Sequence, residues 1–247
     1  MNLSSFQRLV VCSFITLLVA GCSAAPTQQS TAHEDDPWEG MNRSVYSFNK
    51  SVDEAVVSPL ANAYAAITPD FIEQGVENFF NNLADVNNFV NHILQAKPKL
   101  AANDAGRLLI NTTIGIGGLF DVAAKFGMYQ QAEDFGQTLG YWGVDTGPYM
   151  VLPFMGPSTV RDGVGLLADY QLDPVSELQP SSHQTPVQVL RVLDTRVQLQ
   201  DVQQLIIGDE YSFIRDAYLS RRQIQIHDGA PLPSAIDDDF DEFDEFD

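Results

Sequence analysis

Hydrophobic residues recur at helical spacing along most of the chain, and this pattern predicts a series of amphipathic helices. The first stripe runs from Val45 to Val56, so we expect a helix over 41–57 that Pro59 ends or kinks. Its apolar stripe includes Phe48. The same spacing, together with glycine and proline breaks, predicts further helices over 60–67, 100–110, 161–169, 186–207 and 209–226.

The strongest helical pattern begins at Thr68, where a capping threonine is followed by Pro69 and Asp70, residues that suit the first turn of a helix. Apolar positions then repeat up to Leu94, which predicts a helix of about 26 residues and about 40 Å. The opposite face is rich in amides, which are either solvated or line a polar conduit. These amides are Asn78, Asn81, Asn82, Asn87, Asn88 and Asn91.

Two stretches of the chain, 108–120 and 146–160, carry no charged residue. Both are shorter than the roughly 20 apolar residues that a spanning helix needs, so they are expected in the core or at a membrane interface. Glycines in the first stretch either permit close helix contact or end a helix. The residues that we expect at the interface are Ile110, Ile114, Ile116, Leu119, Phe120, Tyr149, Val151, Leu152, Phe154 and Met155.

Glycine and proline limit the helices in the middle of the chain. The segment 133–144 is too rich in glycine for a regular helix interior. The segment 147–157 contains three prolines and two glycines, which exclude a long helix. Since this second segment is uncharged, it is predicted to be a loop that is either buried or placed in lipid, where Tyr149 and Phe154 would suit the aromatic belt.

The N-terminus has the pattern of an export signal. An apolar run over 9–20 leads to Leu-Val-Ala-Gly-Cys, a lipobox that predicts a signal peptide at 1–21 and an acylated Cys22. The alternative is an ordinary signal peptide or an uncleaved anchor. Ser23 stands where an inner-membrane lipoprotein usually has aspartate, so the outer membrane is favoured. Polar residues at 22–35 predict a flexible tether.

Charge narrows the classes of partner. The formal net charge is -20, which argues against nucleic acid and also against attraction to an anionic lipid surface. Membrane attachment must then come from apolar contact or a covalent anchor. The tail at 228–247 ends with eight acidic residues in eleven positions, so it is predicted to be disordered, as a solvated tail or as a docking motif.

No set of residues in the chain indicates an enzyme. Ser158 lacks the second glycine of a nucleophile elbow, and the mature chain has no free thiol. Its histidines are not at metal-ligand spacing, and the glycines near Gly115 do not complete a dinucleotide fingerprint. We therefore expect no metal, no cofactor and no catalytic activity.

The order of short motifs resembles that of the MlaA/VacJ lipoprotein family. The motifs include Asp-Pro-Trp-Glu-Gly-Met-Asn-Arg from Asp36, Asn-Phe-Phe-Asn-Asn-Leu from Asn78 and Asp-Phe-Gly-Gln-Thr-Leu-Gly from Asp134. The resemblance covers about 36–175, with departures at Ala84 and Ala96 that affect only local helix geometry. The matching positions that we take as family motif residues are Asn42, Arg43, Phe48, Asn49, Arg107, Asp134, Gly136, Gly147 and Pro148.

The resemblance implies an all-α domain at 36–227: a ring-like bundle of amphipathic helices embedded in the inner leaflet of the outer membrane, with a polar central channel. Phospholipids misplaced in the outer leaflet would pass through it to the periplasmic carrier MlaC, and the family also associates with trimeric porins. We place Asn111, Thr112, Thr113 and Arg161 on the lipid path. The alternatives are a lipoprotein phospholipase acting on the same lipids and a structural lipoprotein that braces porins.

Overall fold

The computed structural model describes residues 35–200, 206 and 208–229. The predicted signal peptide, Cys22, the tether up to Glu34 and the tail from residue 230 lie outside the described residues. Of the residues that the structure describes, 71% are helical and 4% lie in strands, which confirms the all-α class. No helix in it is both long enough and apolar enough to cross a membrane.

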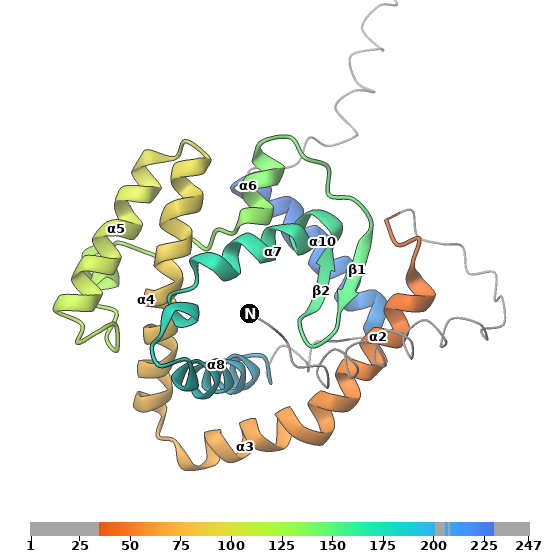
Figure 1. Ribbon diagram of the computed structural model, residues 1–247, viewed down its shortest axis with the longest axis horizontal. Coiled ribbons are helices and arrows are strands. Elements are labelled where there is room, and N and C mark those ends of the chain that lie inside the picture. The colour runs from red at the N-terminus through yellow and green to blue at the C-terminus, as the bar shows by residue number, and fades with distance from the viewer. Residues whose placement is uncertain (1–34, 201–205, 207, 230–247) are drawn as a thin grey trace, which may run out of the picture. The chain divides into compact units, whose positions relative to one another are not determined.

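Eight α-helices and one short hairpin make up the described part of the chain (Figure 1). The helices are α2 Glu39–Val52, α3 Ser58–Ile67, α4 Asp70–Leu94, α5 Pro98–Thr113, α6 Phe135–Tyr141, α7 Val160–Leu172, α8 Gln184–Gln198 and α10 Glu210–Ile226. Short helical turns are η2 Asp53–Val57, η3 Ala123–Phe126, η4 Pro174–Glu177 and η5 Ser181–His183. The strands are β1 Tyr149–Leu152 and β2 Gly156–Thr159, which pair antiparallel.

The predicted break at Pro59 is a bend and not an end. The π-helical turn η2 joins α2 to α3 without interruption, and Pro59 directly follows this turn as the second residue of α3. Within residues 35–229, α2, α3 and α4 continue around a circuit that α7 and the hairpin complete (Figure 1). This arrangement corresponds to the predicted ring-like bundle.

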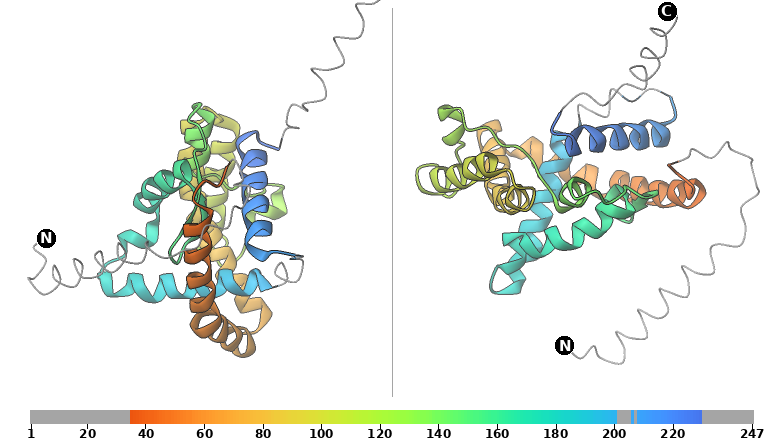
Figure 2. Two further views of the ribbon diagram at one scale, coloured as in Figure 1. Left: turned by 90° about the vertical axis from the view of Figure 1, so that its right-hand side faces the viewer. Right: turned by 90° about the horizontal axis from the view of Figure 1, so that it is seen from above.

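Contacts between distant elements close this circuit. The helix α8 packs against both α3 and α4, α4 pairs with α5, and α6 packs against α7. The helix α10 contacts α6 and β2, and the right-hand view of Figure 2 shows α10 and α7 on opposite sides of α2 and α3. The predicted helix at 209–226 is confirmed as α10, with Asp209 as its cap.

The interior is unusually polar. Among the described residues, eight hydrophobic side chains are buried, against twenty-one that are polar or charged. A buried apolar cluster joins Tyr149 and Val151 of β1 to Tyr211 of α10. Asn82, Asn88 and Asn91 of α4 are buried too, so the amide face of that helix is neither solvated nor a lumen surface at these positions.

Two segments form elements that their composition argued against. The glycine-rich segment 133–144 contains α6, because Asp134 caps it and its glycines allow close packing. A Cβ on Gly165 of α7 would come within 2.4 Å of the backbone nitrogen of Gly136, so both helices need glycine at this crossing. The predicted loop at 147–157 is a β-hairpin, since its prolines lie at the tip and at an edge.

Candidate functional site

The first uncharged stretch forms a tight turn after α5, over residues 114–120, which we call the α5 corner. Ile116, Gly117 and Gly118 all have positive φ, at 54°, 68° and 93°. A Cβ on Gly118 would lie 2.7 Å from Cβ of Asn82, so the turn is pressed against α4. These glycines therefore do both things that were predicted of them: they end a helix and permit close helix contact.

Arg107 holds the α5 corner from inside. Its Nε donates to Asp85 at 3.1 Å, and its terminal nitrogens donate to Asp121 and to the carbonyl oxygen of Met128. Asn111 completes the set, because its amide donates to Asp121 at 3.0 Å and its oxygen accepts from the Ala123 N–H at 2.9 Å. Arg107 and Asn111 are both 2% exposed. Asn111 was predicted to lie on the lipid path, but its burial places it inside the fold.

The outer side of the α5 corner is apolar. Its exposed hydrophobic residues are Ile114, Ile116, Leu119 and Phe120, joined by Leu109, Phe126 and Tyr129 from the adjoining segments. Ile110 is half-buried. Thr112 and Thr113 are exposed beside this surface; Thr112 accepts a hydrogen bond from Asn82, and Thr113 donates to the Leu109 carbonyl. A contiguous apolar surface of this kind marks contact with a partner or a membrane.

Two asparagines of α2 fasten the hairpin. Asn42 donates to the Tyr149 carbonyl at 3.1 Å and accepts from the Val151 N–H at 3.0 Å. Asn49 repeats the pattern at the tip, with the Leu152 carbonyl at 2.9 Å and the Phe154 N–H at 2.8 Å. Residues seven apart share a helix face, so the two amides take the place of a third strand along β1.

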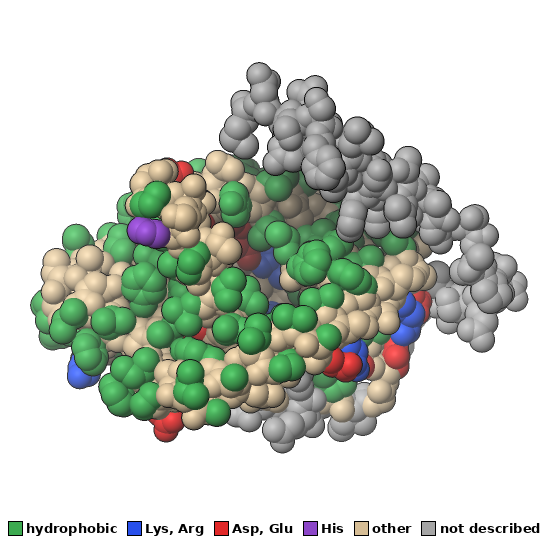
Figure 3. All heavy atoms as spheres, turned by 60° about the horizontal axis from the view of Figure 1, so that its bottom comes forward, with side chains coloured by type: hydrophobic (Ala, Val, Ile, Leu, Met, Phe, Trp, Pro, Cys, Tyr) green, Lys and Arg blue, Asp and Glu red, His purple; other side chains and the backbone are tan. Residues whose placement is uncertain are grey.

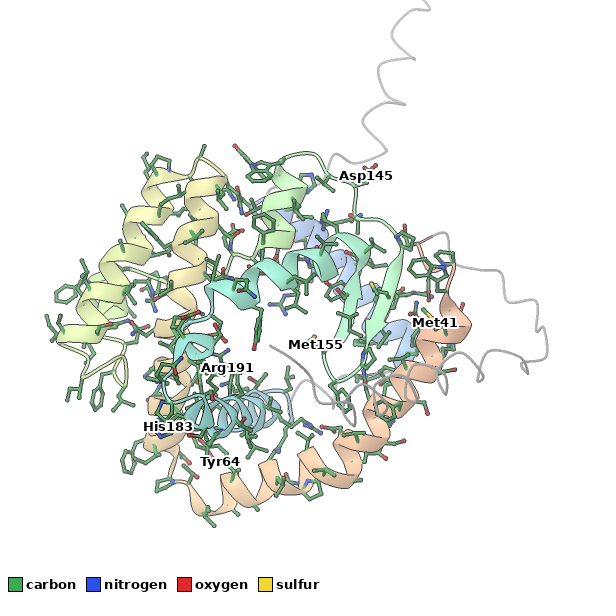
Figure 4. All side chains as sticks on the ribbon, in the orientation of Figure 1. Met41, Tyr64, Asp145, Met155, His183 and Arg191 are labelled. Atoms are coloured by element: carbon green, nitrogen blue, oxygen red, sulfur yellow. The ribbon has the colours of Figure 1, made fainter. Side chains whose placement is uncertain are left out.

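The second set of predicted interface residues lies on the hairpin, where some of the residues are buried and others are exposed. Tyr149 and Val151 are 0% and 4% exposed and belong to the apolar cluster, so the prediction was wrong for these two. Leu152 is half-buried. Phe154 and Met155 are 75% and 69% exposed, and Figure 4 shows Met155 directed from the hairpin tip toward the middle of the circuit. The Phe154 ring packs edge-on against Phe48, with centroids 5.3 Å apart.

A further apolar surface follows α2 and α3 and was not predicted. Phe48 and Val56, which belong to the apolar stripe of the predicted first helix, are exposed. The other large exposed hydrophobic residues on these helices and at the start of α4 are Met41, Leu60, Ile67, Phe71 and Ile72. In the space-filling view, hydrophobic side chains cover much of the face shown (Figure 3). Periodicity could not reveal this surface, because a lipid-facing stripe and a core-facing stripe have the same spacing.

Ion pairs join α6, α7 and α10. Arg222 of α10 donates to Asp134 at 2.5 Å and to Asp162 at 2.8 Å. Arg161, only 5% exposed, donates to Asp162 and to Thr146, so it too is committed to internal bonds and does not face a lipid path. Burial alone would raise the pKa of Asp134 and Asp162, but the bonds and charge of Arg222 outweigh it and lower both pKa values.

The remaining motif residues also stabilise the framework. Arg43 forms ion pairs with Glu39 and Asp209 at 2.7 Å and lies over the Tyr211 ring. Gly147 has a φ of 66° and turns the chain against Val160, whose N–H donates to the Pro148 carbonyl. The motif residues that the structure describes therefore stabilise the fold by hydrogen bonds, ion pairs and turns, and they do not form a reactive site.

One buried cluster has the residue types of a catalytic relay. Nδ1 of His92 lies 2.5 Å from Asp104, and its Nε2 lies 3.6 Å from Glu133. Burial alone would lower the pKa of His92, yet the bonds to the two carboxylates raise it to about 9. His92 and Asp104 are both 0% exposed, so no substrate reaches the ring. The cluster joins α4, α5 and the segment before α6.

Known proteins resemble this chain over most of its length. A family model described as MlaA lipoprotein matches residues 34–225. The intermembrane phospholipid transport system lipoproteins MlaA of Shigella flexneri and Escherichia coli K12 are each 35% identical, over 96% of this chain and 98% of theirs. A solved structure, reported as the structural basis for maintenance of bacterial outer membrane lipid asymmetry, has a TM-score of 0.68 and 34% identity, covering 77% of this chain and 98% of its own. The chain belongs to the MlaA lipoprotein family.

Proposed function

We propose that the protein moves phospholipids between membranes, as the names of its MlaA relatives indicate for them. The observation that carries this proposal is the reversed distribution of side chains. Charged groups such as Arg107 and Asp104 are buried, whereas Ile67 and Phe154 are 82% and 75% exposed. Since soluble proteins rarely leave large apolar patches in water, these surfaces suit the hydrocarbon region of a leaflet.

In this proposal the helices lie in the inner leaflet of the outer membrane, held there by the acylated Cys22 and by the apolar surfaces. Lipids misplaced in the outer leaflet pass through a polar channel within the circuit of helices. They are then taken up by the periplasmic carrier MlaC, while a trimeric porin holds the protein in place. The apolar outer surface closes the inner leaflet to lateral escape, so geometry sets the direction and no covalent step is needed.

Thr112 and Thr113 are the residues that we keep on the lipid path, because both are exposed beside the apolar α5 corner. Valine has a similar shape but no hydroxyl, so replacing both threonines should slow lipid transfer several-fold without unfolding the protein. Thr195→Val on the exposed side of α8 is the matched control. Normal transfer by the double variant would remove these threonines from the path.

The function is tested with the acylated protein in liposomes that contain labelled phospholipid. The carrier is added, separated from the liposomes, and its bound lipid is run on a thin-layer plate. Intact phospholipid that reaches the carrier only when the protein is present supports transport. Lysophospholipid and free fatty acid in its place would identify a hydrolase and refute the proposal.

A further inference from the structure

A cleft opens between α4, the segment that leads into α6, and α10. Its volume is about 330 Å³, near the lower end of the range of small-molecule sites, which is about 300–1,000 Å³. The helix α10 contributes Arg221, Arg222 and Gln225, and the segment before α6 contributes Glu133 and Asp134. Such a volume suits a compact polar group better than a folded peptide segment.

The carboxylates of the cleft already have partners. Both oxygens of Asp134 accept from Arg222 and from Gln137, at distances of 2.5 to 3.2 Å. Glu133 accepts from Lys97 at 3.2 Å, and one of its oxygens lies 3.6 Å from Nε2 of His92. Although burial alone would raise the pKa of each carboxyl, these partners lower both pKa values. The negative charges of the cleft are therefore compensated from within the fold.

The donors on α10 are not all used. Arg221 is exposed and has no ion pair or hydrogen bond within the described ranges. Arg222 is 7% exposed, and its Nε–H is buried without a hydrogen-bond partner among the described residues. The amide nitrogen of Gln225 donates to no group in the described part of the chain, since only its oxygen is engaged, by Arg222 at 3.4 Å. A buried donor without a partner calls for a ligand or an ordered water.

These three donors lie within about one turn of α10, and all three of their residues line the cleft. A phosphate accepts hydrogen bonds through several oxygens, and guanidinium groups are its preferred partners in proteins. We propose that this cleft binds a phosphate group, and specifically the phosphodiester of a phospholipid headgroup. The assignment of the lipid as the source rests on the proposed function.

The surroundings of the cleft favour a headgroup over free phosphate. Tyr141 and Trp142 stand one turn beyond Gln137 at the end of α6, and both are about half exposed. Lys97 lies 5.7 Å from the centre of the Tyr141 ring. Aromatic rings next to cations are typical of the headgroup level of a membrane. A glycerol backbone attached to the phosphate would have an amphipathic surface to rest on.

The site is tested by calorimetric titration of the full acylated protein in a nonionic detergent. The probes are glycerophosphoglycerol, which is a soluble headgroup diester, and inorganic phosphate. Arg221→Ala and Gln225→Leu should each weaken diester binding, and the double variant should weaken it by about tenfold or more. Lys125→Ala, which removes one exposed cation from η3, is the matched control and should bind as the unchanged protein does.

Each result decides the proposal. Diester binding that depends on Arg221 and exceeds phosphate binding supports the headgroup. Equal binding of both probes supports a phosphate site but removes the lipid as its source. Absence of binding, equal loss in the Lys125 control, or tight binding of a peptide of residues 237–247 that phosphate does not displace would overturn the proposal. Because titration requires no transfer, its failure is separate from failure of the liposome assay.

Discussion

Replacing Asp194 by asparagine is expected to stabilise the protein above neutral pH. Asp194 lies on α8 and is 5% exposed, in a cavity of about 190 Å³ that α8 forms with α4. Glu73 and Glu77 of α4 line the same cavity, and no lysine, arginine or histidine of the described residues does so. Within the described residues, the hydrogen bond donated to Asp194 comes from Gln198 at 2.8 Å. The buried hydroxyl of Tyr64 has no partner in the described part of the chain (Figure 4).

The size of the effect follows from the proton affinity of this group. Burial, and after it the charges of Glu77 and Glu73, raise the pKa of Asp194 from 3.8 to about 6. That rise corresponds to about 3 kcal/mol between the folded and unfolded chains. Because the folded chain holds the proton more tightly, its stability falls as pH rises from about 4 through 6, and the full cost remains above that range. Asparagine does not titrate and still accepts from Gln198.

The assay is urea unfolding of the unchanged protein and of Asp194→Asn in detergent micelles, at several pH values from 4 to 8. The two should have equal free energies of unfolding near pH 4, and the variant should be more stable by up to about 3 kcal/mol at pH 8. Asp145→Asn, at an exposed position in the loop after α6, removes the same charge and serves as the control (Figure 4). A difference that is constant with pH, or a variant less stable at pH 8, would refute the reasoning.

Three further predictions concern the hairpin, the buried histidine and the apolar surface. Asn42→Ala should lower the free energy of unfolding by about 3 kcal/mol, because it leaves buried backbone groups of β1 unpaired. Asn49→Ala, at the exposed tip of the hairpin, should lower it less, and chemical denaturation of both variants measures the difference. His92→Asn should lower the free energy of unfolding by about 3 kcal/mol at pH 7. Because the pKa of His92 is raised to about 9, the unchanged protein should lose stability as pH rises from about 6.5 through 9, and the variant should not. A fluorophore on Ile116→Cys should be quenched by brominated lipids, because the exposed α5 corner is proposed to face the hydrocarbon, and one on Ala217→Cys, an exposed position on α10 outside the cleft, should be quenched less. Labelling at these positions is specific because the only other cysteines are Cys12 and Cys22, and equal quenching would count against a membrane-facing α5 corner.

The sequence determined the helices wherever periodicity and end signals agreed. The start signal at Pro69-Asp70 and the apolar repeat to Leu94 predicted the bounds of α4 closely, but the expected cap by Thr68 was wrong, because Pro69 is the N-cap and no side chain caps this helix. The last helix followed from its spacing alone, and the structure shows that Asp209 caps it. These features are local, because capping, proline geometry and helical repeat act within a few residues.

Composition misjudged two segments for a physical reason. Glycine lowers intrinsic helix propensity, which argued against α6, but the tertiary contact between Gly136 and Gly165 requires that very residue type. In the hairpin, Tyr149 and Val151 looked like interface residues, yet β1 finds hydrogen-bond partners in Asn42 and Asn49 of a distant helix and is buried. Such partners are far apart in sequence and leave no mark in local pattern.

Which side of each helix faces outward depends on contacts between distant elements. Periodicity could not distinguish the exposed Phe48 from a core residue or the buried Asn88 from a solvated one, because an amphipathic stripe shows that two faces differ and not what each face contacts. Folding placed Arg107 and His92 among carboxylates in the interior and left Ile67 and Phe154 outside. In this chain the apolar stripe turns outward because the polar faces bind one another.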